Sequence, residues 1–262
     1  MRRIIAGNWK MHKDAAEARN LTDAIKGWVN SNGPEVGVVI APPFPFLAST
    51  VEQVAGLLDE RRMPRILVAA QNCHEEEKGA FTGEVSVPML RSIGVSACIV
   101  GHSERRQYFG ETDAVVGKKI AMLLKHGLLP IYCCGELRNE REEGRYRDVV
   151  ASQLHEALGT MDPSDIERIV VAYEPVWAIG TGLTASPEQA QEMHAFIRQE
   201  LRDLAGDAAL GIPILYGGSC KPDNAEGLFA SPDINGGLIG GAALVAEQFT
   251  ELLRIANKGG KA

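Results

Sequence analysis

Short apolar runs rich in valine and isoleucine recur along the chain at fairly even spacing, and turn-forming residues bound each of them. Most of these runs are continuously apolar rather than alternating, which is typical of strands that are covered on both faces in a parallel sheet. The pattern predicts eight strands, at residues 4–6, 36–41, 66–70, 97–100, 128–134, 169–173, 212–216 and 234–239.

Amphipathic helical patterns fill most of the intervals between the predicted strands. The clearest lie at residues 15–29, 113–126, 187–204 and 244–256. The helix at 187–204 has a capping signal, because Ser186 precedes Pro187 and Gln189 follows three residues after the serine. Strands that alternate with helices in this way indicate an α/β protein.

The length of 262 residues allows either two domains or one large barrel. No linker rich in proline, glycine or serine divides the chain, and eight units over its length amount to roughly 33 residues each, the size of one strand-helix-strand step. We therefore expect residues 1–262 to form a single-domain (β/α)₈ barrel, with eight parallel strands inside and the helices outside.

Composition excludes several classes of partner. With 27 Lys and Arg against 34 Asp and Glu, the net charge of -7 argues against a nucleic-acid or anionic-membrane surface. No run approaches the roughly 18 apolar residues of a membrane helix, and polar Asn8 comes too early for a signal peptide, so we expect a cytoplasmic protein.

The cysteines are Cys73, Cys98, Cys133, Cys134 and Cys220. Their number is odd and they include no CxxC pair, which predicts reduced, buried thiols and no metal site.

Reactive side chains of such a barrel lie where the strands end. Glu174 follows the sixth predicted strand, and Pro175 holds its backbone extended, so this carboxylate is a candidate general base. The alternative is a structural glutamate that pairs with a neighbouring cation. The segment at 175–185 favours the first interpretation, because its apolar beginning and its glycines Gly180 and Gly182 are typical of a lid that closes over a ligand.

Two further strand ends carry candidate groups. His102 follows the fourth strand, where a short helix that begins near Ser103 would favour a neutral imidazole able to donate and exchange a proton. A structural histidine is the alternative. Asn8 and Lys10 follow the first strand, and Lys10 would supply the cation that an anionic substrate needs, with Schiff-base chemistry as the alternative.

Glycine pairs follow the last two strands, at 217–218 and 240–241. The loops after strands 7 and 8 are the usual phosphate site of this barrel, where backbone amides converge on an anion. The loop at 72–83 is long for its position and is either a solvated excursion or a contact for a partner. The charged run at 138–147 predicts an exposed helical face without a function.

Several ordered motifs together make the sequence similar to the triosephosphate isomerase family along essentially the whole chain. They are AGNWKM at 6–11, AQN and GAFTGE around the loop after strand 3, GHSERR at 101–106, FGET at 109–112, CGE at 134–136, YEPVWAIGTG at 173–182, YGGS with KPDN at 216–224, and GGA at 240–242. The resemblance implies interconversion of dihydroxyacetone phosphate and D-glyceraldehyde 3-phosphate through an enediol(ate), in glycolysis and gluconeogenesis, without metal or organic cofactor.

The same resemblance implies a role for each matching residue. Glu174 would move the carbon-bound proton, His102 would handle the proton between the two oxygens, and Lys10 would stabilise negative charge. Asn8, Lys10, Gly180, Ser219, Gly240 and Gly241 would bind the substrate and its phosphate, with Glu104 beside Lys10. The loop that carries Thr82 would insert into a second subunit and form a homodimer.

The sequence departs from the family pattern at Leu183, Cys134, Cys220 and Asn235, none of which matches a catalytic position. Two alternatives stay open. One is an isomerase of a longer ketose phosphate, which a comparison of kcat/KM on three- and four-carbon substrates distinguishes. The other is a sugar-phosphate binder without catalysis, against which the joint presence of Lys10, His102 and Glu174 argues.

Overall fold

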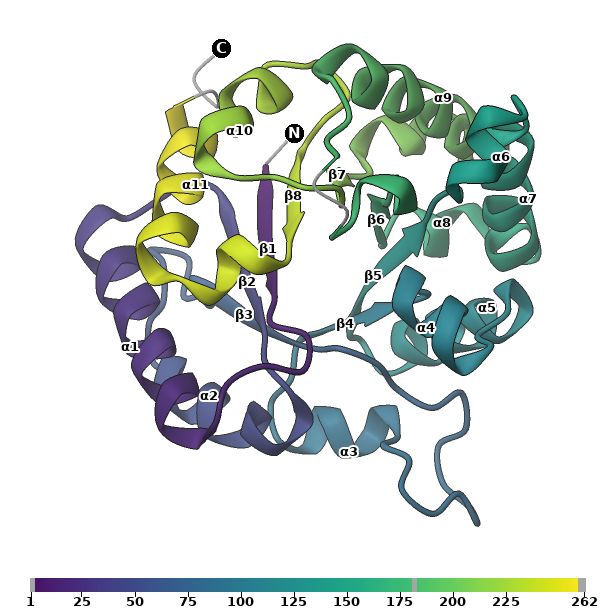
Figure 1. Cartoon of the computed structure of the whole chain (residues 1–262). Helices are drawn as coiled ribbons and strands as arrows, with labels where there is room; N and C mark the ends of the chain where they lie inside the picture. Colours follow the sequence, from purple (N-terminus) through teal and green to yellow (C-terminus); the bar gives the residue numbers. More distant parts are fainter. Residues whose placement is uncertain (1–2, 181–182, 259–262) are drawn as a thin grey trace.

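The structure is a computed structural model that describes residues 3–180 and 183–258. Eight parallel strands pair in chain order and close into one barrel, because β8 pairs with β1 (Figure 1). The predicted fold class is confirmed, and every predicted strand overlaps an observed one. The strands are β1 (Ile4–Asn8), β2 (Gly37–Ala41), β3 (Ile66–Ala70), β4 (Ala97–Val100), β5 (Leu129–Cys134), β6 (Val170–Tyr173), β7 (Ile214–Tyr216) and β8 (Gly236–Ile239).

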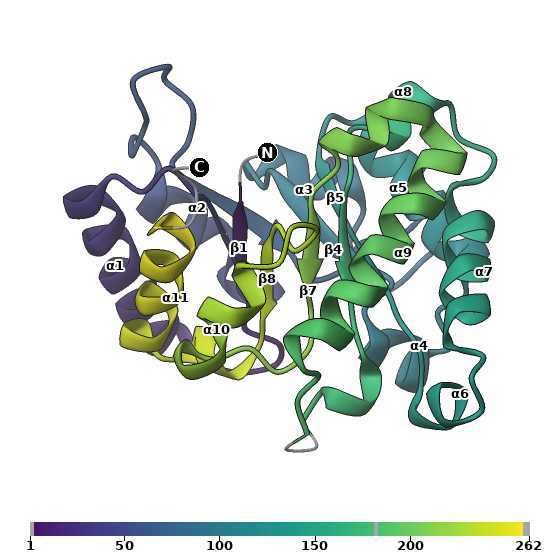
Figure 2. The ribbon, with the colours of Figure 1, turned by 90° about the horizontal axis from the view of Figure 1, so that it is seen from above.

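Helices surround the barrel, and the longer ones run alongside the strands in the side view of Figure 2. The α-helices are α1 (Ala15–Asn32), α2 (Leu47–Val54), α3 (Val87–Ser92), α4 (Ser103–Phe109), α5 (Asp113–Lys125), α6 (Arg138–Glu142), α7 (Tyr146–Leu158), α8 (Pro163–Ile166), α9 (Pro187–Ala205), α10 (Pro222–Phe229) and α11 (Ala246–Lys258). Short 3₁₀ helices lie at η1 (Phe44–Phe46), η2 (Val176–Ala178), η3 (Gly206–Gly211) and η4 (Gly241–Leu244). Among the described residues, none of these helices is long and apolar enough to cross a membrane.

The four helices with clear amphipathic patterns correspond to α1, α5, α9 and α11. The capping signal before α9 is confirmed, since Ser186 Oγ accepts the Gln189 N–H at 3.2 Å and the Gln189 side chain accepts the Ser186 N–H at 3.0 Å. The last helix starts two residues later than predicted, at Ala246, because η4 occupies the turn that leaves β8.

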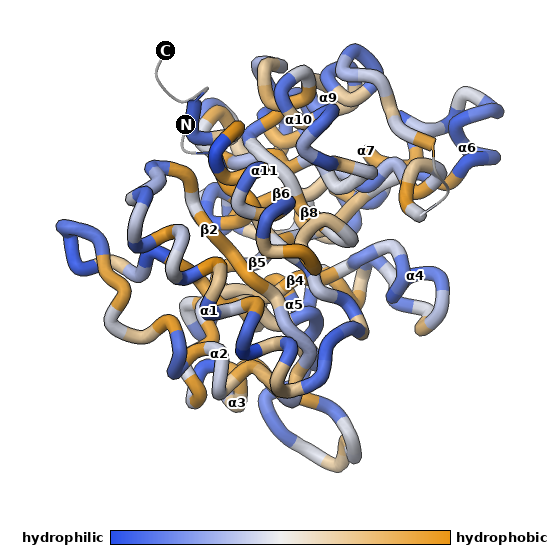
Figure 3. The backbone as a smooth tube through the Cα atoms, turned by 60° about the vertical axis from the view of Figure 1, so that its left-hand side comes forward, coloured by the Kyte–Doolittle hydropathy of each residue, from blue (hydrophilic) through white to orange (hydrophobic). Residues whose placement is uncertain are grey.

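Continuous apolar strands result from burial on both faces of the barrel wall. In β4, Ala97 and Ile99 belong to the cluster inside the barrel, whereas Cys98 and Val100 belong to the cluster between the strands and the helices. A strand with core on each side has no polar face, so alternation disappears from its sequence. Figure 3 shows hydrophobic residues concentrated in the strands, as along β2.

The charged run at 138–147 differs from its prediction as one exposed helical face. Gly144, at φ +77°, separates α6 from α7, so the run does not form one helix. Within it, Arg141 turns inward and binds the buried Glu136 carboxylate at 3.1 Å. The prediction was wrong for Arg141, because a run of charged residues does not reveal that one of them pairs with a buried carboxylate just before the helix.

Candidate active site

A cavity of about 320 Å³ lies at the carboxyl ends of the strands. Its walls come from the loops that follow β1, β4, β6, β7 and β8, and they bring together side chains that are far apart in sequence. Every residue predicted to be catalytic or to bind substrate lines it: Asn8, Lys10, His102, Glu174, Gly180, Ser219, Gly240 and Gly241. The predicted lid glycine Gly182 lies outside the described residues.

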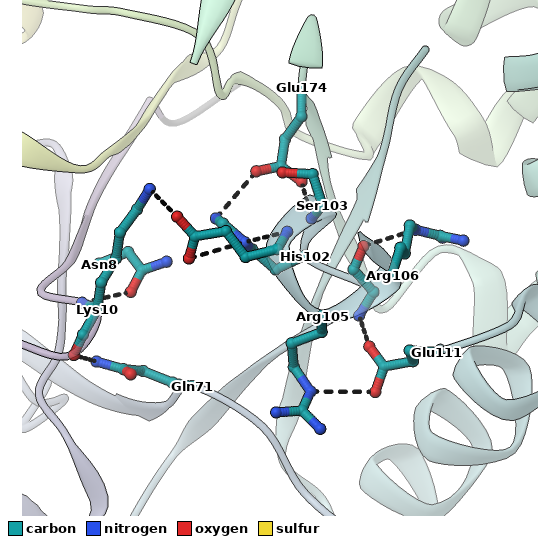
Figure 4. Close-up of polar contacts among 11 residues, drawn as sticks. Asn8, Lys10, Gln71, His102, Ser103, Arg105, Arg106, Glu111 and Glu174 are labelled. Atoms are coloured by element: carbon teal, nitrogen blue, oxygen red, sulfur yellow. Dashed lines mark hydrogen bonds and ion pairs between the residues drawn. The ribbon is translucent and has the colours of Figure 1, made fainter. Parts of the chain in front are cut away.

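Glu174 lies at the end of β6 with only 1 % of its surface exposed. Its Oε1 is 3.0 Å from His102 Nε2, and its Oε2 accepts the Ser103 N–H at 2.8 Å. Both carboxylate oxygens therefore contact residues that follow β4, as Figure 4 shows.

Close backbone packing fixes the main chain at Glu174. A side chain at Gly135, on the neighbouring loop after β5, would overlap the carbonyl oxygen of Glu174. A side chain at Gly217, after β7, would come within 2.9 Å of the Glu174 Cγ. Gln153 holds the Gly135 peptide on both sides, since its Oε1 accepts the Gly135 N–H at 2.8 Å and its Nε2 donates to the Gly135 carbonyl at 3.0 Å. Glycine is thus required on both sides of this carboxylate.

His102 is the N-cap of α4, so the predicted short helix at this position is confirmed. Its Nδ1 accepts the backbone N–H of Glu104 at 3.2 Å. A nitrogen that accepts a hydrogen bond carries no proton, so this contact selects the neutral tautomer with the proton on Nε2. Nε2 itself lies 3.0 Å from Glu174 Oε1.

Lys10 lies on the opposite wall of the cavity, in a backbone conformation that L-residues rarely adopt, with φ at +51°. Two side chains hold that conformation: Asn8 Oδ1 accepts the Lys10 N–H at 3.0 Å, and Gln71 Nε2 donates to the Lys10 carbonyl at 2.9 Å. The Lys10 ammonium is 2.6 Å from Glu104 Oε1, so Glu104 lies beside Lys10, as the family resemblance implies. Gln71 was not predicted as a site residue, although it directly follows β3, which ends at Ala70.

Glycine-rich backbone forms the remaining wall. Gly217, Gly218 and Ser219 come from the loop after β7, and Gly240 and Gly241 come from the loop after β8. A side chain at Gly240 would meet the Lys10 Cε at 3.5 Å, so this loop and the ammonium are neighbours. Lys221 also lines the cavity and adds a second positive charge that the sequence analysis did not single out. The wall offers amide groups and cations, which suits an anion such as a phosphate.

The lid segment at 175–185 is attached through Glu136, a fully buried residue after β5 that the sequence analysis did not single out as a functional residue. Glu136 Oε1 accepts hydrogen bonds from Trp177 Nε1 at 2.8 Å and from the Tyr173 hydroxyl at 3.0 Å, in addition to its ion pair with Arg141. Burial raises the pKa of Glu136, although these hydrogen bonds oppose the change. The beginning of the lid therefore rests on a buried polar cluster rather than on solvent.

Two predicted residues lie outside the cavity or at its edge. Thr82 is exposed on the loop after β3, which projects from the barrel at the lower right of Figure 1. Glu104 touches the site through Lys10. Among the described residues, no group of three or more His, Cys, Asp or Glu side chains could hold a metal ion.

The departures from the family pattern have plain structural surroundings. Cys220 lines the cavity but is buried, and burial raises its pKa to about 12. Burial also raises the pKa of Cys134. Asn235 is structural, since its Oδ1 accepts the Ile214 N–H at 3.0 Å and an Arg198 guanidinium N–H at 2.9 Å. Leu183 is 46 % exposed on the lid.

The fold and the cavity together define an enzyme of the (β/α)₈-barrel class that moves protons on a small anion. Comparison with known proteins narrows the class. The family model described as "Triosephosphate isomerase" matches residues 3–256, and the chain belongs to that family. Proteins named triosephosphate isomerase from Prosthecochloris aestuarii and Chlorobium phaeovibrioides are 52 % and 51 % identical to it, over 98 % and 97 % of this chain and 99 % of theirs. One from Cytophaga hutchinsonii is 46 % identical over 97 % of this chain and 98 % of its own.

Proposed function

We propose that the protein interconverts dihydroxyacetone phosphate and D-glyceraldehyde 3-phosphate, as its relatives' name describes. The observation that carries the proposal is the meeting of Glu174, His102 and Lys10 on one glycine-lined cavity. A carboxylate base, a neutral imidazole with its proton on Nε2 and an ammonium group are the three groups that an enediolate pathway needs.

In the proposed reaction, the Glu174 carboxylate removes a proton from the carbon beside the carbonyl. His102 donates its Nε2 proton to the carbonyl oxygen and takes the hydroxyl proton of the neighbouring oxygen, so the imidazole ends neutral. Glu174 then returns its proton to the other carbon. Lys10 and Asn8 stabilise the negative charge on the enediolate oxygens, while the backbone at Gly180, Ser219, Gly240 and Gly241 binds the phosphate.

The contact between Glu174 and His102 requires a movement during the reaction. At 3.0 Å from Nε2, the carboxylate leaves no room for a substrate carbon between the two groups. When substrate binds, its carbonyl oxygen must therefore replace Glu174 as the partner of His102 Nε2. The Glu174 carboxylate must then move away from both His102 and the Ser103 N–H. Because Glu174 directly precedes the lid segment, closure of the lid supplies that movement and excludes water from the enediolate.

The experiment that tests the proposal is a coupled isomerase assay combined with exchange of the substrate carbon-bound hydrogen in deuterated water. We expect turnover and deuterium incorporation, both of which disappear in Glu174→Gln. Tight binding of triose phosphate without exchange would instead support the binder. A four-carbon ketose phosphate serves as the control substrate, and a higher kcat/KM on it would contradict the proposed specificity.

We further propose that the protein is a homodimer formed through the loop after β3. Thr82 and Phe81 are exposed at the end of this loop, and Met11, next to Lys10, is 94 % exposed. Tyr108 and Phe109, at the end of α4, are each 69 % exposed. Apolar side chains at this level of exposure are typical of a surface that a partner covers.

A cytoplasmic location is part of the same proposal. All five cysteines are free and buried, which agrees with a reducing compartment. Comparison of activity between the cytoplasmic and other fractions of the source cells tests it, and activity confined to another fraction would contradict it.

A further inference from the structure

The peptide before His102 is held by side chains rather than by a neighbouring strand. Gly101 is the first residue after β4, and its N–H donates to Glu111 Oε2 at 3.0 Å. Its carbonyl oxygen accepts from Arg106 Nε at 2.7 Å. Gly101 has a φ of +71°, and a side chain there would lie 3.0 Å from the Cys133 carbonyl oxygen, so this position favours glycine. Directly after Val100, the last paired residue of β4, the chain is therefore held by the Glu111 and Arg106 side chains, whose contacts are drawn in Figure 4.

Glu111 is itself fixed by a buried ion pair. Its side chain is 2 % exposed, and its Oε1 contacts Lys119 Nζ on α5 and, at 3.4 Å, Arg105 Nε. Burial alone would raise the pKa of Glu111, but Lys119 and Arg105 outweigh it and lower that pKa. Lys119 Nζ also donates to Asn72 Oδ1, at the base of the loop after β3, at 2.9 Å. The carboxylate that holds Gly101 is thus ionised, and its two oxygens contact three partners: Gly101, Lys119 and Arg105.

We propose that Glu111 is a positioning residue for His102, acting through the Gly101 peptide, and this inference rests on the proposed role of His102 as the proton donor to substrate. Glu111 does not line the cavity and touches no reacting atom. Its effect is geometric: one peptide separates its anchor from the His102 Cα, and the imidazole must keep its Nε2 proton aimed at the position where the substrate oxygen binds.

The size of the expected effect follows from how steeply proton transfer depends on placement. A shift of about 1 Å in a catalytic group costs roughly 100-fold in rate. Loss of the Gly101 anchor moves His102 by a fraction of that, because Arg106 and the α4 cap remain. We therefore expect kcat to fall about tenfold while KM changes little, since the glycine loops that bind phosphate are elsewhere.

Two double variants separate positioning from stability. Removal of one partner alone would leave a buried unpaired charge, so both are replaced together. Glu111→Gln with Lys119→Met keeps an amide oxygen that can accept the Gly101 N–H, whereas Glu111→Leu with Lys119→Met removes the acceptor. The first variant should retain kcat within about threefold of the parent, and the second should lose about tenfold, with KM changed less than about threefold in both. Arg198→Met, which removes buried hydrogen bonds at Ala209 and Ile212, is the control for general destabilisation and should leave kcat unchanged.

A readout that needs no substrate distinguishes failure of this inference from failure of the proposed activity. The ¹⁵N resonances of the His102 imidazole report its tautomer in the resting protein. Because the α4 cap that selects the tautomer remains, we expect the leucine double variant to keep a protonated Nε2 but to shift its resonance, and the glutamine double variant to keep the parental resonance. If both doubles fold and show parental kcat and parental imidazole resonances, Glu111 has no positioning role. If the resonances change as expected in a protein without isomerase activity, the positioning holds and the proposed function fails.

Discussion

The Oε1 atom of Glu174 and the Nε2 atom of His102 lie 3.0 Å apart at the mouth of the barrel. The Oε2 atom of the same carboxylate accepts the N–H of Ser103, which is 71 positions away in the sequence. The base and the proton donor of the proposed reaction are therefore in direct contact with each other in the resting protein. Substrate has to replace this contact, which keeps both groups close together and buried before the substrate arrives.

Shortening the base tests how closely the carboxylate must approach. Glu174→Asp keeps the charge but withdraws the carboxylate by one methylene, so we expect kcat to fall about 100-fold. His102→Gln can donate a hydrogen bond but cannot exchange the proton, and it should lose a similar factor. The coupled assay measures both, and normal turnover in either variant would contradict the assigned roles.

Trp177→Phe tests the polar cluster beneath the lid. It removes the indole N–H that donates to Glu136 at 2.8 Å, while Tyr173 and Arg141 remain. Because the lid has to move in each cycle, kcat and KM should change together, by roughly threefold to tenfold. Steady-state kinetics check this. Trp28→Phe on α1 is the matched control and should leave both constants within about twofold. Equal effects of the two substitutions would contradict a special role of the Trp177–Glu136 contact beneath the lid.

His194 predicts how stability depends on pH. It is fully buried on α9, and burial lowers its pKa to about 4 from the ordinary 6.5. The unfolded chain therefore binds a proton at this residue near pH 6.5, and the folded chain binds it only near pH 4. The contribution of the neutral His194 to the free energy of unfolding is thus complete above pH 6.5 and is lost as the pH falls to 4. We expect a loss of about 3 kcal/mol over that interval.

Urea unfolding at a series of pH values measures this dependence. His194→Gln should flatten the slope between pH 6.5 and 4, whereas His155→Gln, at a residue whose side chain is 49 % exposed, should leave it unchanged. An unchanged slope in His194→Gln would show that other groups control acid unfolding.

The proposed dimer predicts a link between assembly and activity. Thr82→Arg places a charge where the loop would enter its partner, so we expect sedimentation to report a monomer and kcat to fall at least about tenfold. Glu60→Arg, on the exposed segment between α2 and β3, introduces the same residue elsewhere and should stay dimeric and active. A monomer with full activity would contradict the predicted coupling.

The strands and the cavity were largely predictable because burial on both faces and the polar ends of strands are local signals. β3 and β4 have their predicted bounds, and His102, Lys10 and Glu174 meet where the barrel topology requires. The supporting residues were not predictable in the same way. Glu111 lies between α4 and α5 and Lys119 lies in α5, so neither residue is at the end of a predicted strand. Only the packing of α5 against the barrel makes them a buried pair.

Gln71 and Glu136 show a different limit. Both lie within two residues of the end of a strand, β3 for Gln71 and β5 for Glu136, so the rule that found Asn8 could have found them. The sequence does not show in which direction each side chain points. Gln71 donates a hydrogen bond to the Lys10 carbonyl, and Glu136 faces the lid rather than the cavity. Arg141 was misjudged for the same reason, because its partner comes from outside its own helix.

Gly135 has a consequence for how this barrel tolerates mutation. It touches no part of the cavity, carries no chemistry and lies one strand away from the base, yet any side chain there would displace the Glu174 main chain. A saturation survey of the chain should therefore find this position as intolerant as the reactive residues themselves. Intolerance to substitution here marks the space that the Glu174 main chain occupies, not contact with substrate.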